Sequence, residues 1–231
     1  MGKRIKDTIF HIIPAYSILP LLFTVIMNSV AYYGGRLLAG NLPHIVLETP
    51  LDNRIPLIPW TLMIYFGCYI FWIVNYILIA REDRESVCRF FSADITARLV
   101  CFVFFLVLPT TNIRPEIPAT GFWNQGMRFL YRVDAADNLF PSIHCLTSWF
   151  CYIGIRNRKE IPSWYQKLSC IAAIAVFIST LTTKQHVLFD VAGGVILAEI
   201  TWWAAGHTCL SDIYKIILQK TENTGRKWFE K

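Results

Sequence analysis

Charged residues are scarce in this sequence. They make up 16% of the 231 residues, whereas hydrophobic residues make up 55%. A soluble helical protein needs a polar face along each helix, and the long apolar segments here contain too few polar residues to supply one. The sequence also has no internal repeat and no low-complexity linker, which favours a single domain over residues 1–231. We therefore expect an integral membrane protein.

Cysteine spacings typical of zinc or redox sites are also missing. The seven cysteines are odd in number, have no CxxC spacing and lie mostly inside apolar segments, so we interpret them as small buried hydrophobic residues. No basic stripe with interleaved aromatic residues is present. The net charge of +6 therefore indicates anchoring at the inner membrane leaflet and not nucleic-acid binding.

Apolar segments of about 20 residues cross a bilayer core as helices. We predict six, near residues 8–33, 57–80, 90–109, 139–155, 166–183 and 187–206, with a charged tail at 209–231 that forms a helix on the inner surface. Arg98 falls inside the third segment and would have to snorkel toward the headgroups. The predicted fold class is all-α, a polytopic six-helix membrane bundle with non-helical connections at residues 34–59 and 110–138.

Lysine and arginine are unevenly distributed between the two sides of this bundle. With the N-terminus inside, sixteen of the 22 basic residues fall on the cytoplasmic side. The other side holds six: Arg36, Arg54, Arg114, Arg128, Arg132 and Lys184. The positive-inside rule then places both termini in the cytoplasm, in a multi-pass protein that we expect in the plasma membrane.

Two histidines stand at the edges of apolar segments, where a membrane protein rarely keeps an ionisable residue without a function. His144 begins the fourth predicted helix. His186 begins the sixth, and Asp190 follows four residues later on the same helix face. A carboxylate at one imidazole nitrogen fixes the tautomer and makes the other nitrogen more nucleophilic. We predict that His186 is a nucleophile oriented by Asp190, and that His144 is the general acid and base of a phosphoryl transfer.

Three further residues are candidates for binding the phosphate. Arg114 offers a bidentate guanidinium, and Ser142 offers a hydroxyl together with the free amides at the start of the fourth helix. Lys184 lies two residues before His186. Pro141 suits the first turn of the fourth helix. On the predicted topology all of these side chains lie at similar depth on the extracytoplasmic side.

The order of these motifs resembles the type 2 phosphatidic acid phosphatase superfamily over more than half of the chain. The resemblance rests on Arg114-Pro115, Pro141-Ser142-Ile143-His144 and Ser179…His186…Asp190. It implies a six-helix membrane bundle whose phosphohistidine chemistry needs no metal and no cofactor. It also implies a lipid phosphate as the substrate, with the catalytic roles already given to His144, His186 and Asp190.

The chain departs from this family pattern at three positions. Val107 stands where the first motif has a lysine, Ile143 where the second has a glycine, and Thr180 where the third has an arginine. Such a pattern is similar to the inositol phosphorylceramide synthase and sphingomyelin synthase-like branch, which transfers a phosphoryl headgroup from a lipid to an alcohol. With two cations missing, we favour a phosphodiester substrate and an alcohol acceptor over a simple phosphomonoester.

We therefore expect a lipid-phosphate phosphatase or phosphotransferase that works at the extracytoplasmic face. Two alternatives stay open. One is a metal-dependent membrane hydrolase with His144, His186 and Asp190 as ligands, which sensitivity to EDTA would reveal. The other is a non-catalytic polytopic protein such as a transporter, against which the missing paired hydropathy repeats argue. Gly193 and Gly194 are expected to let the sixth helix pack closely.

Overall fold

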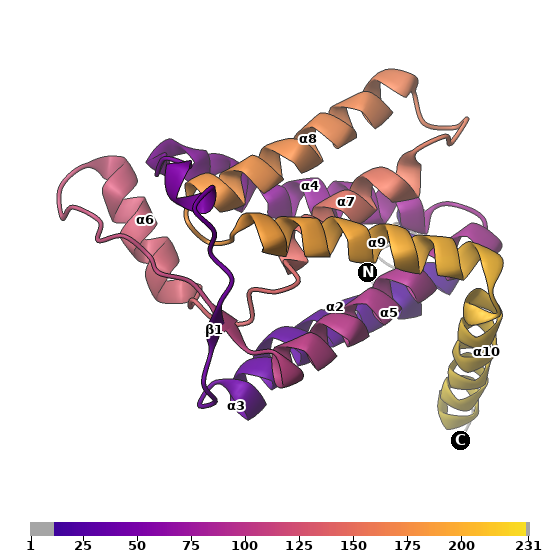
Figure 1. Cartoon of the computed structure of the whole chain (residues 1–231). Helices are drawn as coiled ribbons and strands as arrows, with labels where there is room; N and C mark the ends of the chain where they lie inside the picture. The colour runs from indigo at the N-terminus through magenta and orange to yellow at the C-terminus, as the bar shows by residue number, and fades with distance from the viewer. Residues whose placement is uncertain (1–11, 230–231) are drawn as a thin grey trace.

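The computed structural model describes residues 12–229, with side chains described up to residue 223. Its architecture is mainly helical (Figure 1). In chain order the elements are α2 (Ala15–Ser29), the π-helical turn η1 (Val30–Gly34), α3 (Gly35–Ala39), β1 (Ile45–Val46), the 3-10 turns η2 (Asp52–Arg54) and η3 (Pro59–Thr61), α4 (Leu62–Ala80), α5 (Arg84–Val107), β2 (Thr110–Thr111), α6 (Phe122–Val133), α7 (Ile143–Ile155), α8 (Ser163–Thr182), α9 (Leu188–His207) and α10 (Leu210–Phe229).

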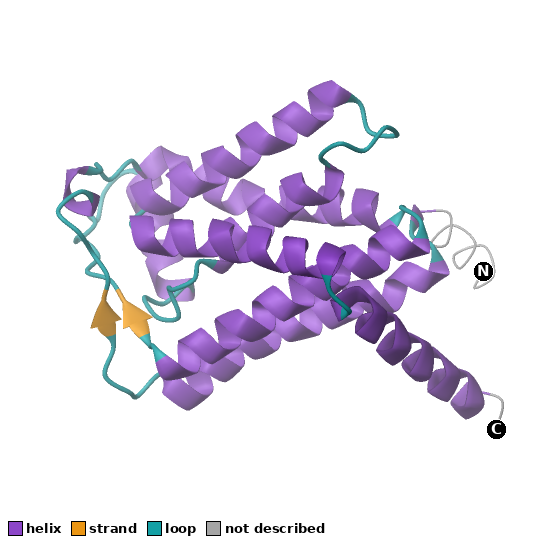
Figure 2. Ribbon diagram, turned by 45° about the vertical axis from the view of Figure 1, so that its right-hand side comes forward, coloured by secondary structure: helices purple, strands orange, loops and turns teal. Residues whose placement is uncertain are grey.

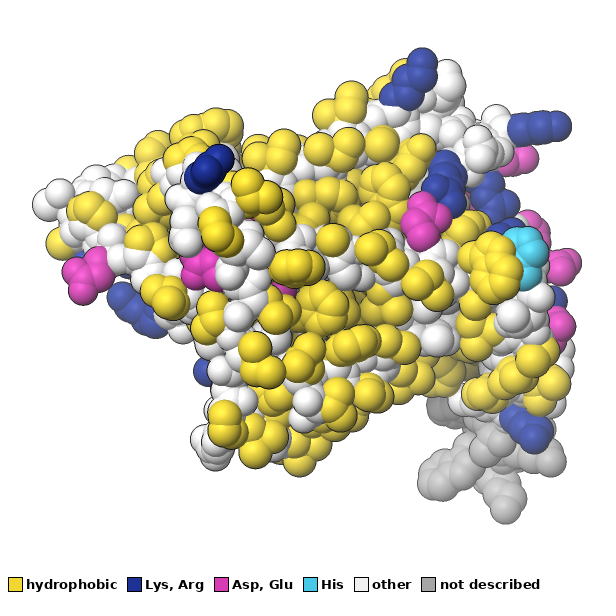
Figure 3. Space-filling model, viewed as in Figure 1, with side chains coloured by type: hydrophobic (Ala, Val, Ile, Leu, Met, Phe, Trp, Pro, Cys, Tyr) yellow, Lys and Arg dark blue, Asp and Glu magenta, His cyan; other side chains and the backbone are white. Residues whose placement is uncertain are grey.

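Among the described residues, five helical segments are long and apolar enough to cross a membrane. They are Ala15–Ala39, Pro59–Ala80, Arg84–Val107, Ser163–Thr182 and Leu188–His207. Figure 3 shows hydrophobic side chains over most of the middle of one face, with charged side chains mainly toward its ends. These features are those of an integral membrane protein.

The remaining predicted span, the fourth, near residues 139–155, corresponds to α7, which has 13 residues. At about 1.5 Å per residue, α7 is about 20 Å long, shorter than a hydrocarbon core of about 30 Å. Helix length alone therefore does not confirm six spans. The chain before α7 enters the bundle as irregular backbone, which is tolerated at membrane depth where it lines a cavity.

The helices run between two ends of the molecule. At one, the α10 end, the start of α2 meets the turn between α4 and α5: the Ser17 hydroxyl donates to the Ala80 carbonyl at 2.6 Å. Lys215 of α10 lies 3.6 Å from Glu85 there. At the other, the α6 end, β1 pairs in parallel with β2 (Figure 2). These contacts assign neither end to a side of the membrane.

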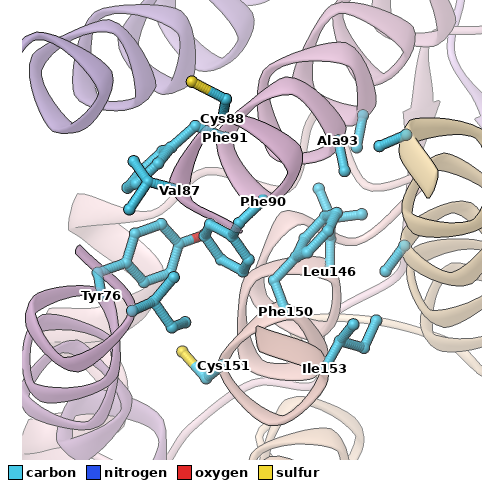
Figure 4. Close-up of a cluster of buried hydrophobic side chains, with 14 of the residues drawn as sticks. Tyr76, Val87, Cys88, Phe90, Phe91, Ala93, Leu146, Phe150, Cys151 and Ile153 are labelled. Atoms are coloured by element: carbon cyan, nitrogen blue, oxygen red, sulfur yellow. The ribbon is translucent and has the colours of Figure 1, made fainter. Parts of the chain in front are cut away.

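The main core forms where α4, α5, α7 and α9 meet. Figure 4 shows Phe90 and Phe91 of α5 beside Tyr76 of α4 and Phe150 of α7. The ring of Phe90 packs edge-on against Phe91 and Phe150, at centroid distances of 5.2 and 5.7 Å. This core fixes the relative positions of α7 and α9, the two helices that begin at or near His144 and His186.

Arg98 does not snorkel as the sequence suggested. Arg98 is only 2% exposed, and its guanidinium lies 3.0 Å from the carboxylate of Asp94, one helical turn earlier. It also donates to the hydroxyls of Tyr76 and Thr147, at 3.1 and 3.3 Å, and to the side-chain amide oxygen of Asn28. A buried charge is stable when it is paired and hydrogen-bonded in this way. The third span can therefore start earlier, at Arg84.

Some predicted boundaries were wrong. The first helix runs on to Ala39, into the stretch expected to be non-helical, whereas residues 8–11 of that prediction lie outside the described residues. Residues 122–133 form α6 inside another expected loop. Gly126 lies within α6, and a Cβ there would lie 2.6 Å from the Leu62 side chain, so this glycine lets α6 approach α4. The predicted helix in the tail is confirmed as α10.

Candidate active site

His186 and Asp190 form a hydrogen-bonded pair where α9 begins. The His186 Nδ1 atom lies 3.2 Å from Asp190 Oδ2, and both residues are buried. The same carboxylate oxygen accepts from the Val187 amide at 3.0 Å. An ionised carboxylate only accepts hydrogen bonds, so Nδ1 carries the proton and Nε2 keeps its lone pair. This is the tautomer that a nucleophilic histidine needs.

The connection between α8 and α9 holds His186 in place. The backbone amides of Gln185 and His186 donate to the Thr180 carbonyl, at 2.9 and 3.1 Å. Lys184 adopts a left-handed conformation with a φ of 55°, which turns the chain sharply between the two helices. The buried Thr180, where the family pattern has an arginine, donates its hydroxyl to the Phe177 carbonyl at 2.8 Å. No cation therefore reaches the site from this position.

His144 faces His186 from the first turn of α7, with a distance of 5.9 Å between ring centroids. Its imidazole packs against Tyr65 at 4.6 Å and Trp72 at 5.4 Å. The His144 Nε2 atom is buried and has no hydrogen-bond partner among the described residues. It is therefore free to exchange a proton with a bound substrate.

The two histidines line one cavity of about 350 Å³ at the α6 end. Its wall includes several aromatic side chains of α4, together with Gln185, Asp134 and Asp137. Tyr65 and Tyr69, which lie beside His144, are one to two turns into α4. The histidine cavity therefore extends up to about 10 Å along α4 from the start of that helix. The cavity is of a size that holds a ligand headgroup.

Asp134 is the main residue that sequence reasoning missed. Tyr65 and Tyr32 donate their hydroxyls to its two oxygens, at 2.5 and 2.9 Å. Burial alone would raise the pKa of Asp134, but the nearby His144 and the two tyrosine hydrogen bonds outweigh burial and hold this pKa below its ordinary value. Tyr32, Tyr65 and Asp134 come from three distant segments of the chain, so no local spacing in the sequence could have indicated this cluster.

Arg114 lies behind the cavity wall and does not line it. Its guanidinium donates to the Asp134 carbonyl and to Gln185 Oε1, both at 2.7 Å, and covers the ring of Tyr131 at 4.8 Å. The Arg114 Nε and Gln185 Nε2 atoms are buried without a partner among the described residues. Gln185, which the sequence did not single out, thus connects the arginine to the cavity.

Ser142 ties the start of α7 to α9. Its hydroxyl caps α7 by accepting from the Cys145 amide at 3.3 Å, and its own amide donates to the Asp190 carbonyl at 3.1 Å. The Ser142 amide is therefore not available to a phosphate, and Pro141 precedes the cap instead of occupying the first turn. The amides of Ile143 and His144 have no intrahelical acceptor, as at every helix start.

Close approach of α9 to α7 depends on two glycines, as the sequence predicted. A Cβ on Gly194 would lie 2.6 Å from the Ser142 carbonyl oxygen, and one on Gly193 would lie 2.5 Å from the Phe140 ring. Lys184 is placed differently from expectation. Its ammonium donates to the Asp52 carbonyl at 2.9 Å, and it does not line the histidine cavity.

A model of the PAP2 superfamily matches residues 43–204, about two thirds of the chain and the whole of this site. The chain belongs to the PAP2 superfamily. A search of curated proteins finds no significant match. Superfamily membership and the membrane-type helices together support a phosphatase or phosphotransferase activity.

Charged side chains are few around the two histidines of this PAP2 protein. Within the part of the chain that the structure describes, no three His, Cys, Asp or Glu side chains converge as a metal site would require. Val107, where the family pattern has a lysine, is 71% exposed at the end of α5. Among the described residues, the lining of this cavity has no lysine or arginine and has two partly buried carboxylates, those of Asp134 and Asp137.

Proposed function

We propose that this PAP2 protein is a membrane phosphatase or phosphotransferase that acts on a lipid phosphate through a phosphohistidine. The observation that carries the proposal is the His186–Asp190 pair opposite His144 across one buried cavity. Nε2 of His186 is free, and Asp190 is placed to stabilise the positive charge that develops on the ring when Nε2 is phosphorylated.

The reaction proceeds in two steps. First, His186 Nε2 attacks phosphorus, the bond to the lipid alkoxide breaks, and protonated His144 gives its proton to that leaving oxygen. Second, water or an alcohol attacks phosphorus, the P–N bond breaks, and His144 takes the proton of the incoming hydroxyl. His186 is then regenerated, and the acceptor alone decides between hydrolysis and transfer.

The phosphate oxygens are bound by a mixed set of donors. The amides of Ile143 and His144 have no intrahelical acceptor, and Gln185, which lines the cavity, has a buried Nε2 atom without a partner among the described side chains. Arg114 acts mainly through Gln185 and the Asp134 backbone. Ser142 supports the helix start, and Lys184 contributes only after a rearrangement of the connection between α8 and α9.

A phosphodiester fits this cavity better than a monoester does. Arg114 is one of few cations near it, Val107 and Thr180 supply none, and Asp134 places a negative charge in the wall. A diester carries a single negative charge and needs less compensation than a monoester. We therefore assign a headgroup-bearing lipid as donor and an alcohol as acceptor, in line with the resemblance to the inositol phosphorylceramide and sphingomyelin synthase-like branch.

In this proposal the protein spans the plasma membrane six times, with α7 as the short fourth span. Both termini are cytoplasmic and the cavity opens on the extracytoplasmic side, because most basic residues then lie inside. The α7 helix and the irregular chain before it together cover the membrane thickness.

Turnover of a lipid panel by purified protein in uncharged detergent tests this function. We expect release or transfer of headgroup phosphate that persists in EDTA, with diesters preferred and product diverted when an alcohol acceptor is added. Loss of activity in EDTA would favour the metal-dependent hydrolase. No turnover of any mono- or diester lipid would contradict the enzymatic assignment.

A further inference from the structure

A second cavity, of about 640 Å³, lies at the α10 end and shares no lining residue with the histidine cavity. Its walls come from α5, from the turn between α7 and α8, and from the end of α9. Trp202, which lines it, lies 14 residues beyond the start of α9, on the order of 20 Å along the helix from His186. The two cavities are therefore separate sites.

Three arginines line this cavity: Arg89, Arg156 and Arg158. Arg156 is engaged by Glu199 through two bonds, at 2.8 and 2.9 Å. Arg158 donates to Ser86 Oγ at 2.9 Å and lies 3.5 Å from Glu82. Each of these two cations thus has a carboxylate partner.

Arg89 differs from its two neighbours. No carboxylate among the described side chains lies within ion-pair distance of it, and its Nε atom is buried without a partner there. Its guanidinium stacks on Trp202 at 4.2 Å. Glu85, the acidic residue of the lining, is paired instead with Lys215. The cavity therefore contains one uncompensated positive charge.

The absence of a side chain on Gly206 keeps the Arg89 guanidinium in this position. A Cβ at residue 206 would lie 2.7 Å from the Arg89 Cζ atom. The guanidinium therefore lies between the glycine and the ring of Trp202. The planar fork of a guanidinium matches the geometry of phosphate oxygens.

We propose that this cavity binds a phosphate-bearing anion, with Arg89 as the principal ligand. Arg158 and the hydroxyls of Ser86 and Ser211 stand beside it in the same lining. The anion is either the headgroup of an anionic phospholipid or a soluble phosphate compound, because both present the same oxygens. The volume accommodates a group larger than inorganic phosphate.

Binding measurements on the purified full-length protein test this site. One arm titrates inorganic phosphate in uncharged detergent and follows the thermal unfolding midpoint. The other places the protein in phosphatidylcholine nanodiscs with and without phosphatidic acid. In both arms the readout is the thermal unfolding midpoint. A rise of the midpoint with inorganic phosphate identifies a soluble anion as sufficient. A rise only with phosphatidic acid identifies a lipid headgroup. A shift in neither arm overturns the proposal.

Three variants locate the binding. Arg89→Gln should weaken binding of the anion about tenfold or more. Gly206→Ala should weaken it in the same direction without changing any charge, because the methyl group displaces the guanidinium. Arg84→Gln is the matched control, since Arg84 is on the same helix, is half-exposed and is paired with Glu222. Equal binding in wild type and Arg89→Gln, or equal weakening in Arg84→Gln, overturns the assignment.

Discussion

Asp190 uses one oxygen, Oδ2, for both His186 Nδ1 and the Val187 amide. An asparagine at this position keeps an acceptor and the volume but removes the charge that balances a phosphorylated imidazole. We expect Asp190→Asn to lower kcat by about 100-fold or more, with little change in the thermal unfolding midpoint. Asp212→Asn, an exposed position on α10, is the control. Near-normal kcat in Asp190→Asn would contradict the role given to this carboxylate.

Arg114 influences the cavity through the residues it holds. Its two bonds fix the Asp134 backbone and the Gln185 side chain, and a charge-assisted bond is worth about 1.5–3 kcal/mol. We expect Arg114→Ala to reduce kcat/KM by about one to two decades, and Arg114→Lys to recover only part because the fork is lost. Steady-state kinetics measure both, with the exposed Arg128→Ala as control. Full recovery by lysine would show that only the charge matters.

At the scale of elements, Asp52 connects the loop before α4 to the start of α9. Its Oδ1 accepts from the Leu188 amide at 2.7 Å, and its Oδ2 accepts from the Thr49 amide at 2.9 Å. Burial alone would raise the pKa of Asp52, but the hydrogen bonds from Thr49 and Leu188 and the charge of Lys184 hold it below its ordinary value. The ionised form is therefore the one that stabilises the fold.

This depressed pKa predicts a pH-dependent loss of stability. The contribution of Asp52 is fully present above the ordinary carboxyl pKa of about 4 and is lost as the pH falls through the lower folded-state value. Asp52→Asn should lower the free energy of unfolding by about 1–3 kcal/mol at pH 7, and by much less near pH 3. Unfolding midpoints of both proteins, with Glu48→Gln as control, measure this. The same difference at both pH values would contradict the account.

Helices with a continuous apolar sequence were predictable, because residues that face lipid are apolar and form long uncharged segments in the sequence. The His186–Asp190 pair was predictable for a similar reason, since its geometry follows from a spacing of four residues. The helix α6 was missed because it has no continuous apolar run: it is amphipathic, with Met127 and Leu130 buried on one face. Asp134 and its tyrosine partners were missed because they meet only after distant segments pack.

At the scale of the whole molecule, the charge distribution predicts the orientation in the membrane. A single cysteine introduced in the exposed part of α6, in a background where Cys209 is replaced, should react with an impermeant thiol reagent in intact cells. A cysteine introduced at Ser211 should react only after permeabilisation. The physical reason is the excess of basic residues at the α10 end. Labelling of Ser211→Cys but not of the α6 site in intact cells would invert the topology.

The central claim is that His186 carries the phosphoryl group, and trapping of that intermediate tests it most directly. Purified protein is mixed with a lipid labelled in its phosphate, quenched and analysed for acid-labile, alkali-stable label on the chain. We predict label in wild type and in His207→Ala, more label in His144→Ala because release slows, and none in His186→Ala. Label or full turnover in His186→Ala would contradict the phosphohistidine mechanism.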